Sequence, residues 1–164
     1  MTKCNFIKKT SQIGIAGVFL FFVACTHKIQ PLPKESYLLF IKAPQLKFND
    51  FVWLSQNDEV LQLQAFSLGK SLTHIVIYKN KNKICLQKYC TSKTEFNEEY
   101  LGTGYPKELF LQILLGQEIK EGQNRVRIQN GFEQKIGSIS YKKKGNRVLF
   151  KDTGLVVRIK KVEQ

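Results

Sequence analysis

The chain has 164 residues, of which 26 are basic and 13 are acidic, and its formal net charge is +13. This length is enough for one domain with a hydrophobic core. A balance this basic favours an anionic partner, either nucleic acid or anionic lipid, or else a solvated surface of lysines. With two histidines, no glycine-rich phosphate loop and no nucleophile elbow, we expect no enzyme activity, no catalytic residues, no metal and no other cofactor.

An apolar run, Ile13 to Ala24, follows a start that carries three lysines and no acidic residue. A basic start, a short apolar middle and small residues before a cleavage site are typical of a secretory signal peptide. The run is shorter than a membrane-spanning helix, which needs about 20 apolar residues. Residues 22–25, FVAC, resemble a bacterial lipobox, in which the cysteine is acylated and becomes the first mature residue.

We therefore interpret residues 1–24 as a lipoprotein signal peptide, 25–35 as a lipidated N-terminus and tether, and 36–164 as one domain. Cys25 is the expected lipidation site and so the contact with membrane lipid, with ordinary cleavage beside an incidental cysteine as the alternative. Thr26 is not the aspartate typical of inner-membrane retention, so we expect an outer-membrane, periplasm-facing location. Because we expect the chain to be exported, we expect no nucleic-acid partner.

Two further cysteines, Cys85 and Cys90, flank a four-residue segment. An even pair in an oxidising compartment favours a disulfide, with two free thiols as the alternative. Zinc would need more ligands, and His27 and His74 are both distant in sequence.

Most of the domain alternates between apolar and polar residues with a period of two, which predicts strands with one buried face and one solvated face in an antiparallel sheet. Turn-forming segments separate them, for example Ser55–Glu59, Ser67–Lys70 and Asn80–Asn82, so we expect about eight or nine short strands. The expected buried positions are Phe51/Trp53, Leu61/Leu63/Ala65, Ile75/Ile77, Val126/Ile128, Ile139/Tyr141, Val148/Phe150 and Val157/Ile159.

Two segments, Glu95–Tyr100 and Pro106–Leu115, have helical patterns, and Pro106 and Gly116 suit the start and the end of the second. Such a helix either covers an ordinary core or forms a lid over a curved sheet. The apolar residues that share one of its faces are Leu109, Phe110, Ile113 and Leu114.

Asn49–Leu86, with its tryptophan strand, polar turn, leucine strand and Ser67-Leu68-Gly69 loop, is similar to the LolB family of outer-membrane lipoprotein receptors. Tyr105–Gln117 resembles the helix of that family, and Gly137–Ile159 resembles its closing hairpins. In the loop, Ser67 stands where the family has a proline.

This resemblance implies a mainly β fold with helices (α+β): a strongly curved, incompletely closed antiparallel sheet, or half-barrel, with helices covering its open face. It implies a monomer that takes acyl chains of lipoproteins or lipids from a periplasmic carrier of the LolA type and helps place them in the outer membrane. Leu68 would be the membrane or cargo-transfer residue; a turn leucine folded into the core is the alternative. The expected cavity residues are Trp53, Leu61, Leu63, Ile75, Ile77, Leu109, Phe110, Ile113 and Leu114.

A second hypothesis comes from a different class of function. In it, the chain is a structural or accessory periplasmic lipoprotein that binds a protein partner through a sheet edge. An open apolar cavity would favour the first hypothesis, and a filled core with an exposed edge would favour the second.

Overall fold

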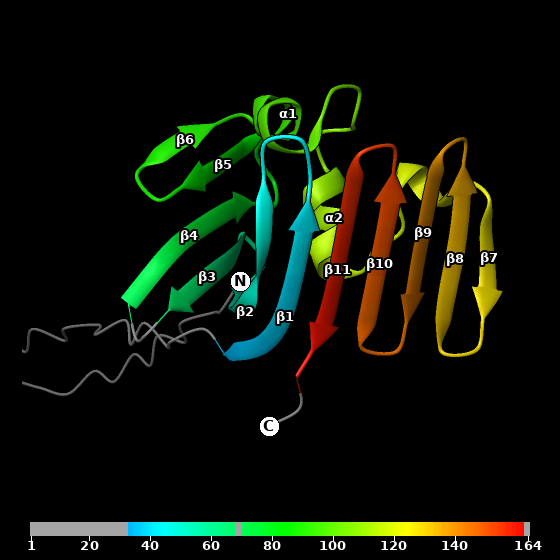
Figure 1. Ribbon diagram of the computed structural model, residues 1–164, viewed down its shortest axis with the longest axis horizontal. Coiled ribbons are helices and arrows are strands. Elements are labelled where there is room, and N and C mark those ends of the chain that lie inside the picture. Colours follow the sequence, from blue (N-terminus) through cyan, green and yellow to red (C-terminus); the bar gives the residue numbers. More distant parts are fainter. Residues whose placement is uncertain (1–32, 68–69, 163–164) are drawn as a thin grey trace, which may run out of the picture. The chain divides into compact units, whose positions relative to one another are not determined.

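The computed structural model of the protein describes residues 33–67 and 70–162 (Figure 1). The expected signal peptide, Cys25 and Leu68 lie outside these described residues. The first described strand begins at Lys34, two residues before the expected start of the domain.

The described chain forms one antiparallel sheet of eleven strands, which confirms a mainly β fold. The strand order is β6-β5-β4-β3-β2-β1-β11-β10-β9-β8-β7 (Figure 1), and β6 and β7 do not pair, so the sheet is not closed. The strands are β1 (Lys34–Lys42), β2 (Lys47–Gln56), β3 (Val60–Ser67), β4 (Lys70–Tyr78), β5 (Lys83–Leu86), β6 (Tyr89–Thr91), β7 (Arg125–Ile128), β8 (Gly131–Ile136), β9 (Ile139–Lys144), β10 (Arg147–Asp152) and β11 (Leu155–Lys161).

The helical elements lie between β6 and β7: α1 (Lys93–Phe96), a π-helical turn η1 (Asn97–Leu101), α2 (Leu109–Leu115) and a 3-10 turn η2 (Lys120–Gly122). A capping box begins α1, because the Ser92 hydroxyl accepts from the Glu95 backbone N–H and the Glu95 carboxylate accepts from the Ser92 N–H, both at 3.1 Å.

The second helix ends as the sequence predicts but begins later. Gly116 caps α2 in the left-handed conformation, with a φ of 62°, which glycine adopts without the cost that a side chain imposes. Pro106 is not the first helical residue, as its position predicted. Its carbonyl accepts from the Leu109 N–H at 3.0 Å and from the Asn97 side-chain amide at 2.8 Å, and these bonds hold it in a turn before the helix.

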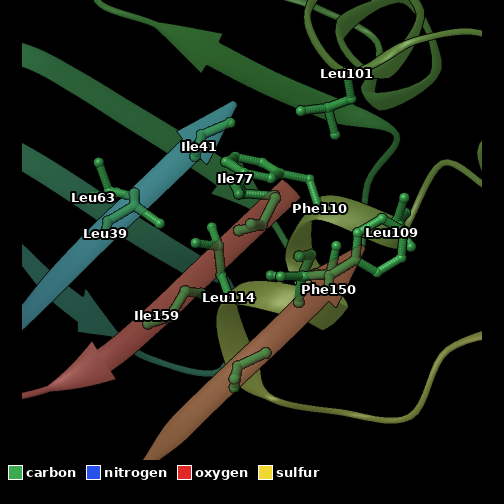
Figure 2. Close-up of a cluster of buried hydrophobic side chains, with 14 of the residues drawn as sticks. Leu39, Ile41, Leu63, Ile77, Leu101, Leu109, Phe110, Leu114, Phe150 and Ile159 are labelled. Carbon is green, nitrogen blue, oxygen red and sulfur yellow. The ribbon is translucent and has the colours of Figure 1, made fainter. Parts of the chain in front are cut away.

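The inward face of the sheet and one side of α2 share a single hydrophobic core. Figure 2 shows Leu109, Phe110 and Leu114 of α2 together with strand residues that include Phe150 and Ile159. The alternation predicted the buried side of β3, β4 and β9–β11 correctly. The residues that were predicted to be buried and are buried in these strands are Leu61, Leu63, Ala65, Ile75, Ile77, Ile139, Tyr141, Val148, Phe150, Val157 and Ile159.

The faces of β2 are reversed relative to the sequence prediction. Val52 and Leu54 are buried, whereas Phe51 is 58% and Trp53 is 42% exposed. Residues 51–54 are all apolar, so alternation alone does not fix which side of this strand faces the core. The pairing decides it, because Val52 lies opposite Ala65 and Leu54 opposite Leu63, both of which are buried.

The prediction for β7 is also wrong, since Val126 is 62% exposed. This strand is an edge of the sheet, and its residues Arg125 and Arg127 lie opposite the buried Gln134 and Phe132 of β8. The Arg125 guanidinium lies 5.3 Å from the centre of the Phe132 ring. A cation–π contact therefore takes the place that an aliphatic side chain would fill in a central strand.

Candidate functional site

Residues of the inward face of the sheet and of α1, η1 and α2 line an apolar pocket of about 130 Å³. Strand residues form one part of its lining and aromatic rings from the helical elements form another. Thr73 and the phenol of Tyr100 are the polar groups of this lining. The lining residues are Leu39, Ile41, Leu46, Phe48, Leu63, Thr73, Ile75, Leu86, Phe96, Tyr100 and Phe110.

The strand part of the lining follows from pairing between neighbouring strands. Leu39 and Ile41 are inward positions of β1, and Leu63 and Ile75 lie directly opposite each other on β3 and β4. The turn between β1 and β2 is closed by a hydrogen bond of 2.8 Å from the Ala43 N–H to the Leu46 carbonyl. This turn brings further apolar side chains to the pocket, where large aliphatic groups leave a surface without strong hydrogen-bonding groups.

Three aromatic rings from the helical elements complete the lining. The Phe96 ring centre lies 4.8 Å from that of Tyr100 and 5.3 Å from that of Phe110, so the rings form one tilted cluster. A hydrogen bond to Glu99 raises the pKa of Tyr100 above its ordinary value of 10.0. The Tyr100 phenol is therefore neutral at physiological pH and adds no charge to the pocket.

The two helical elements beside the pocket are joined by polar contacts. The buried Lys93 Nζ lies 2.7 Å from a Glu108 carboxylate oxygen and donates to the Lys79 carbonyl at 3.3 Å. The buried Asn97 amide bonds the Pro106 carbonyl. A buried ammonium without these partners would be costly, so the contacts fix α1 relative to the start of α2.

The size of the pocket limits what it holds in this conformation. An apolar cavity of about 150 Å³ accommodates benzene, so the pocket matches the end of an acyl chain but not its whole length. A second space of about 200 Å³, which shares no lining residue with this pocket, is lined by Leu61 and Leu114 but also by the polar Glu35, Ser55 and Gln56. Its polar lining suits water better than hydrocarbon.

The residues predicted from sequence to line a cavity do not all lie together. Leu63, Ile75 and Phe110 line the apolar pocket, and Leu61 and Leu114 line the second space. Three more of the predicted residues, Ile77, Leu109 and Ile113, belong to the packed core.

The prediction that Trp53 lines the cavity is wrong, because this residue lies on the opposite face of the sheet. Its ring packs 4.6 Å from the Phe66 ring, and the Lys34 ammonium lies 4.9 Å from its centre. Trp53 faces outward because Val52 and Leu54, and not Phe51 and Trp53, are the residues of β2 that face the core.

Sequence reasoning missed the contribution of β1 to the pocket. Residues 37–41, YLLFI, form an unbroken apolar run, which predicts burial but not which of its residues face inward. Leu39 and Ile41 are the inward pair. Their alignment opposite β11, where Leu39 faces Ile159 and Ile41 faces Val157, was the missing information.

Cys85 and Cys90 face each other across β5 and β6 and are joined by a disulfide bond with an S–S distance of 2.02 Å. The bond ties the three-residue edge strand β6 to the sheet.

Within the described residues, no group of three or more His, Cys, Asp or Glu side chains is placed to hold a metal ion. None of the helices in residues 33–67 and 70–162 is long and apolar enough to cross a membrane. His74 Nε2 and the Tyr141 hydroxyl are buried without a hydrogen-bond partner in this part of the chain, and burial raises the pKa of Tyr141. These two groups lie on different strands and are not lining residues of the apolar pocket.

Comparisons of the sequence with protein-family models and with curated proteins find no match.

Proposed function

We propose that this protein is an outer-membrane lipoprotein that binds acyl chains of lipoproteins or lipids and helps place them in the membrane. The observation that carries the proposal is the apolar pocket, whose lining offers hydrocarbon and aromatic surface with two weakly polar groups. Burial of a methylene group there stabilises the complex by about 0.8 kcal/mol. No covalent chemistry is needed for capture or release, and a carrier of the LolA type would supply the cargo.

We also propose that the sheet curves around the pocket as a half-barrel and that α1, η1 and α2 cover its open face. The tilted cluster of Phe96, Tyr100 and Phe110 supports this arrangement, because the three rings come from these elements and contact the pocket. A long acyl chain would enter by displacing the rings. The link between Lys93 and Glu108 would keep the helical elements together as they move.

The accessory-protein hypothesis has less support. It requires a sheet edge that is free to pair with another chain, and both edges of the described sheet are short. β6 has three residues, and β7 has four, two of which are arginines. Short and charged edge strands resist pairing with a further strand.

The pocket is tested by photo-crosslinking with a diazirine analogue of palmitate, using the full chain in membranes. We expect cross-links at pocket residues such as Phe48 and Phe96. Thr73→Phe, which places a ring in the pocket, should remove most of them, whereas Val156→Phe enlarges a side chain of β11 outside the pocket and should not. Equal labelling of both variants, or labels only outside the pocket, would refute the proposal.

The anchor is tested separately by metabolic labelling with a fatty acid. Cys25→Ser should abolish the label and leave precursor, or a released form if ordinary cleavage replaces lipoprotein processing. A serine variant that is still labelled would remove Cys25 from the proposal without affecting the pocket.

A further inference from the structure

The outward face of β1–β3 carries a contiguous group of large apolar side chains, which we call the outer apolar patch: Leu38, Phe40, Phe51, Trp53 and Phe66. Pairing brings them together, because Leu38 lies opposite Phe51 and the Trp53 and Phe66 rings are 4.6 Å apart. Phe51, Trp53 and Leu38 are 58%, 42% and 37% exposed. Contiguous exposed apolar groups of this kind mark interaction surfaces, whereas scattered ones do not.

Cations surround the outer apolar patch on the same face. The Lys34 ammonium lies over Trp53, and the Arg158 guanidinium lies 5.2 Å from the centre of the Phe40 ring. Further outward cations follow on β9–β11, namely Lys142, Arg147, Lys151 and Lys160. Glu133, the one acidic residue at an outward position of the described strands, is already paired with Lys142. The face is therefore positive, and its natural partner is anionic.

We propose that this outward face lies on an anionic membrane surface, with the outer apolar patch in the interfacial region and the surrounding cations on lipid phosphates. Aromatic side chains favour the membrane interface, and each cation near an anionic leaflet adds to the attraction. Both requirements are met on one continuous strand surface. This inference goes beyond the proposed function, because it concerns the face opposite the pocket and holds whether or not the pocket takes acyl chains.

Trp53 makes the proposal directly measurable. It is the single tryptophan of the chain and belongs to the patch itself. Its fluorescence therefore reports whether this face touches the bilayer, and an anchor at Cys25 alone does not bury it. Quenching by lipids with brominated acyl chains reports contact with the apolar interior, and quenching by acrylamide reports contact with water.

The experiment uses the full chain, purified from membranes and reconstituted into vesicles of brominated phosphatidylcholine, with or without about one third phosphatidylglycerol. We expect Trp53 to be quenched by the lipid and protected from acrylamide only in the anionic vesicles. In about 1 M salt, where the Debye length falls to about 3 Å, the quenching should be lost.

A charge-reversal variant separates this face from net charge. Arg147→Glu, Arg158→Glu and Lys160→Glu together should reduce the quenched fraction about tenfold, because the attraction of three cations becomes repulsion. Lys88→Glu, Lys107→Glu and Lys120→Glu change net charge equally at exposed residues that belong to none of these strands and should leave quenching in place.

A second pair of variants tests the proposal even if the triple charge-reversal variant does not fold. Phe51→Ser should weaken lipid quenching of Trp53, whereas Tyr89→Ser, at an 83% exposed residue of β6, should not. Equal quenching in neutral and anionic vesicles would overturn the proposal. So would a freely water-accessible Trp53 in both, or protection of Trp53 by a single-stranded oligonucleotide but not by vesicles. The palmitate cross-linking experiment tests the pocket separately, so none of these outcomes decides whether the pocket binds acyl chains.

Discussion

Arg147 of β10 and Lys160 of β11 lie directly opposite each other on the outward face of the sheet. Lys144 of β9 lies opposite Arg147 on its other side, so three cations occupy adjacent positions across three strands. Like charges directly opposite in an antiparallel pair destabilise it. The fold carries this cost on the face that we propose to meet anionic lipid, where phosphates would neutralise the repulsion.

Lys160→Glu should therefore stabilise the isolated protein. Replacing one member of the like-charged pair with an acid turns repulsion into attraction, and we expect a gain of about 0.5 to 1 kcal/mol in the free energy of unfolding. Urea unfolding at low ionic strength measures it. Lys151→Glu is the control, because Lys151 lies opposite the uncharged Ser140 and Val156. A loss of stability in Lys160→Glu would show that the repulsion is negligible.

Glu108→Gln should destabilise the protein by about 2 kcal/mol, because it leaves the buried Lys93 ammonium without its carboxylate. The loss is smaller than for a fully buried pair, since the Glu108 side chain is 34% exposed. Glu118→Gln removes the exposed partner of Arg125 and should cost less than about 1 kcal/mol. Comparable losses in the two variants, measured by thermal unfolding, would contradict this account of Lys93.

Acid should weaken the contact between the start of β1 and the end of β11. The hydrogen bond from Lys161 holds the pKa of Glu35 below its ordinary value of 4.5, and the Tyr37 hydroxyl also donates to this carboxylate. Folding lowers the pKa of the Glu35 carboxyl, so the carboxylate stabilises the folded state fully when the pH is above the ordinary pKa. This stabilisation is lost as the pH falls through the lowered pKa of the folded state.

Glu35→Gln should accordingly be less stable than the native sequence at neutral pH, by less than about 1 kcal/mol because the pair is exposed. The difference should vanish in acid, once the native carboxyl is protonated. Urea unfolding at several pH values measures both. A difference that grows on acidification would reverse the assigned sign.

The Cys85–Cys90 bond should be present in protein from the periplasm. Mass spectrometry without reduction should find the peptide pair lighter by two hydrogens, and two thiols open to alkylation would contradict it. A bond across so short a loop stabilises by about 2 kcal/mol through the entropy of the unfolded chain. Replacing both cysteines with serine should lower the free energy of unfolding by that amount.

Leu68→Glu should leave thermal unfolding unchanged and impair membrane contact or cargo release, as expected if Leu68 is an exposed loop residue beside Lys70. A buried leucine would behave differently, because the substitution would drive an unpaired charge into the core. A large fall in melting temperature would place Leu68 in the core and end its functional assignment.

The sequence identified the buried face in the paired strands where apolar and polar residues alternate strictly, but not in the edge strand β7, where Val126 lies between two arginines and is exposed. Leu61, Leu63 and Ala65 of β3 are separated by glutamines, and their inward direction was predicted correctly. Apolar and polar residues do not alternate in this part of β2, because Phe51 and Trp53 are separated by a valine and followed by a leucine. Their direction depends on pairing with another strand, which a single strand cannot reveal.

The pocket was harder to predict than the core. Burial of Phe110 follows from its place on the apolar side of a helix, but a pocket depends on which buried side chains fail to fill the space between them. The unfilled space here depends on how β1, β4 and the rings of Phe96 and Tyr100 are placed relative to one another. Local patterns carry no information about such packing of distant segments.

The position of β1 has a consequence for how the chain folds. Apart from the β1–β11 pairing, every strand pairs only with its neighbours in sequence, which gives two meanders, β1–β6 and β7–β11, and the β1–β11 pairing joins them. Glu35 and Lys161, which meet at this seam, are 126 positions apart. Hairpins within each meander close small loops and form early, whereas the seam must close a loop of nearly the whole domain. Under the export that we propose, the sheet is completed only after β11 has emerged from the translocation channel, and until then the edges of β1 and β10 stay open to the chaperones that meet the chain.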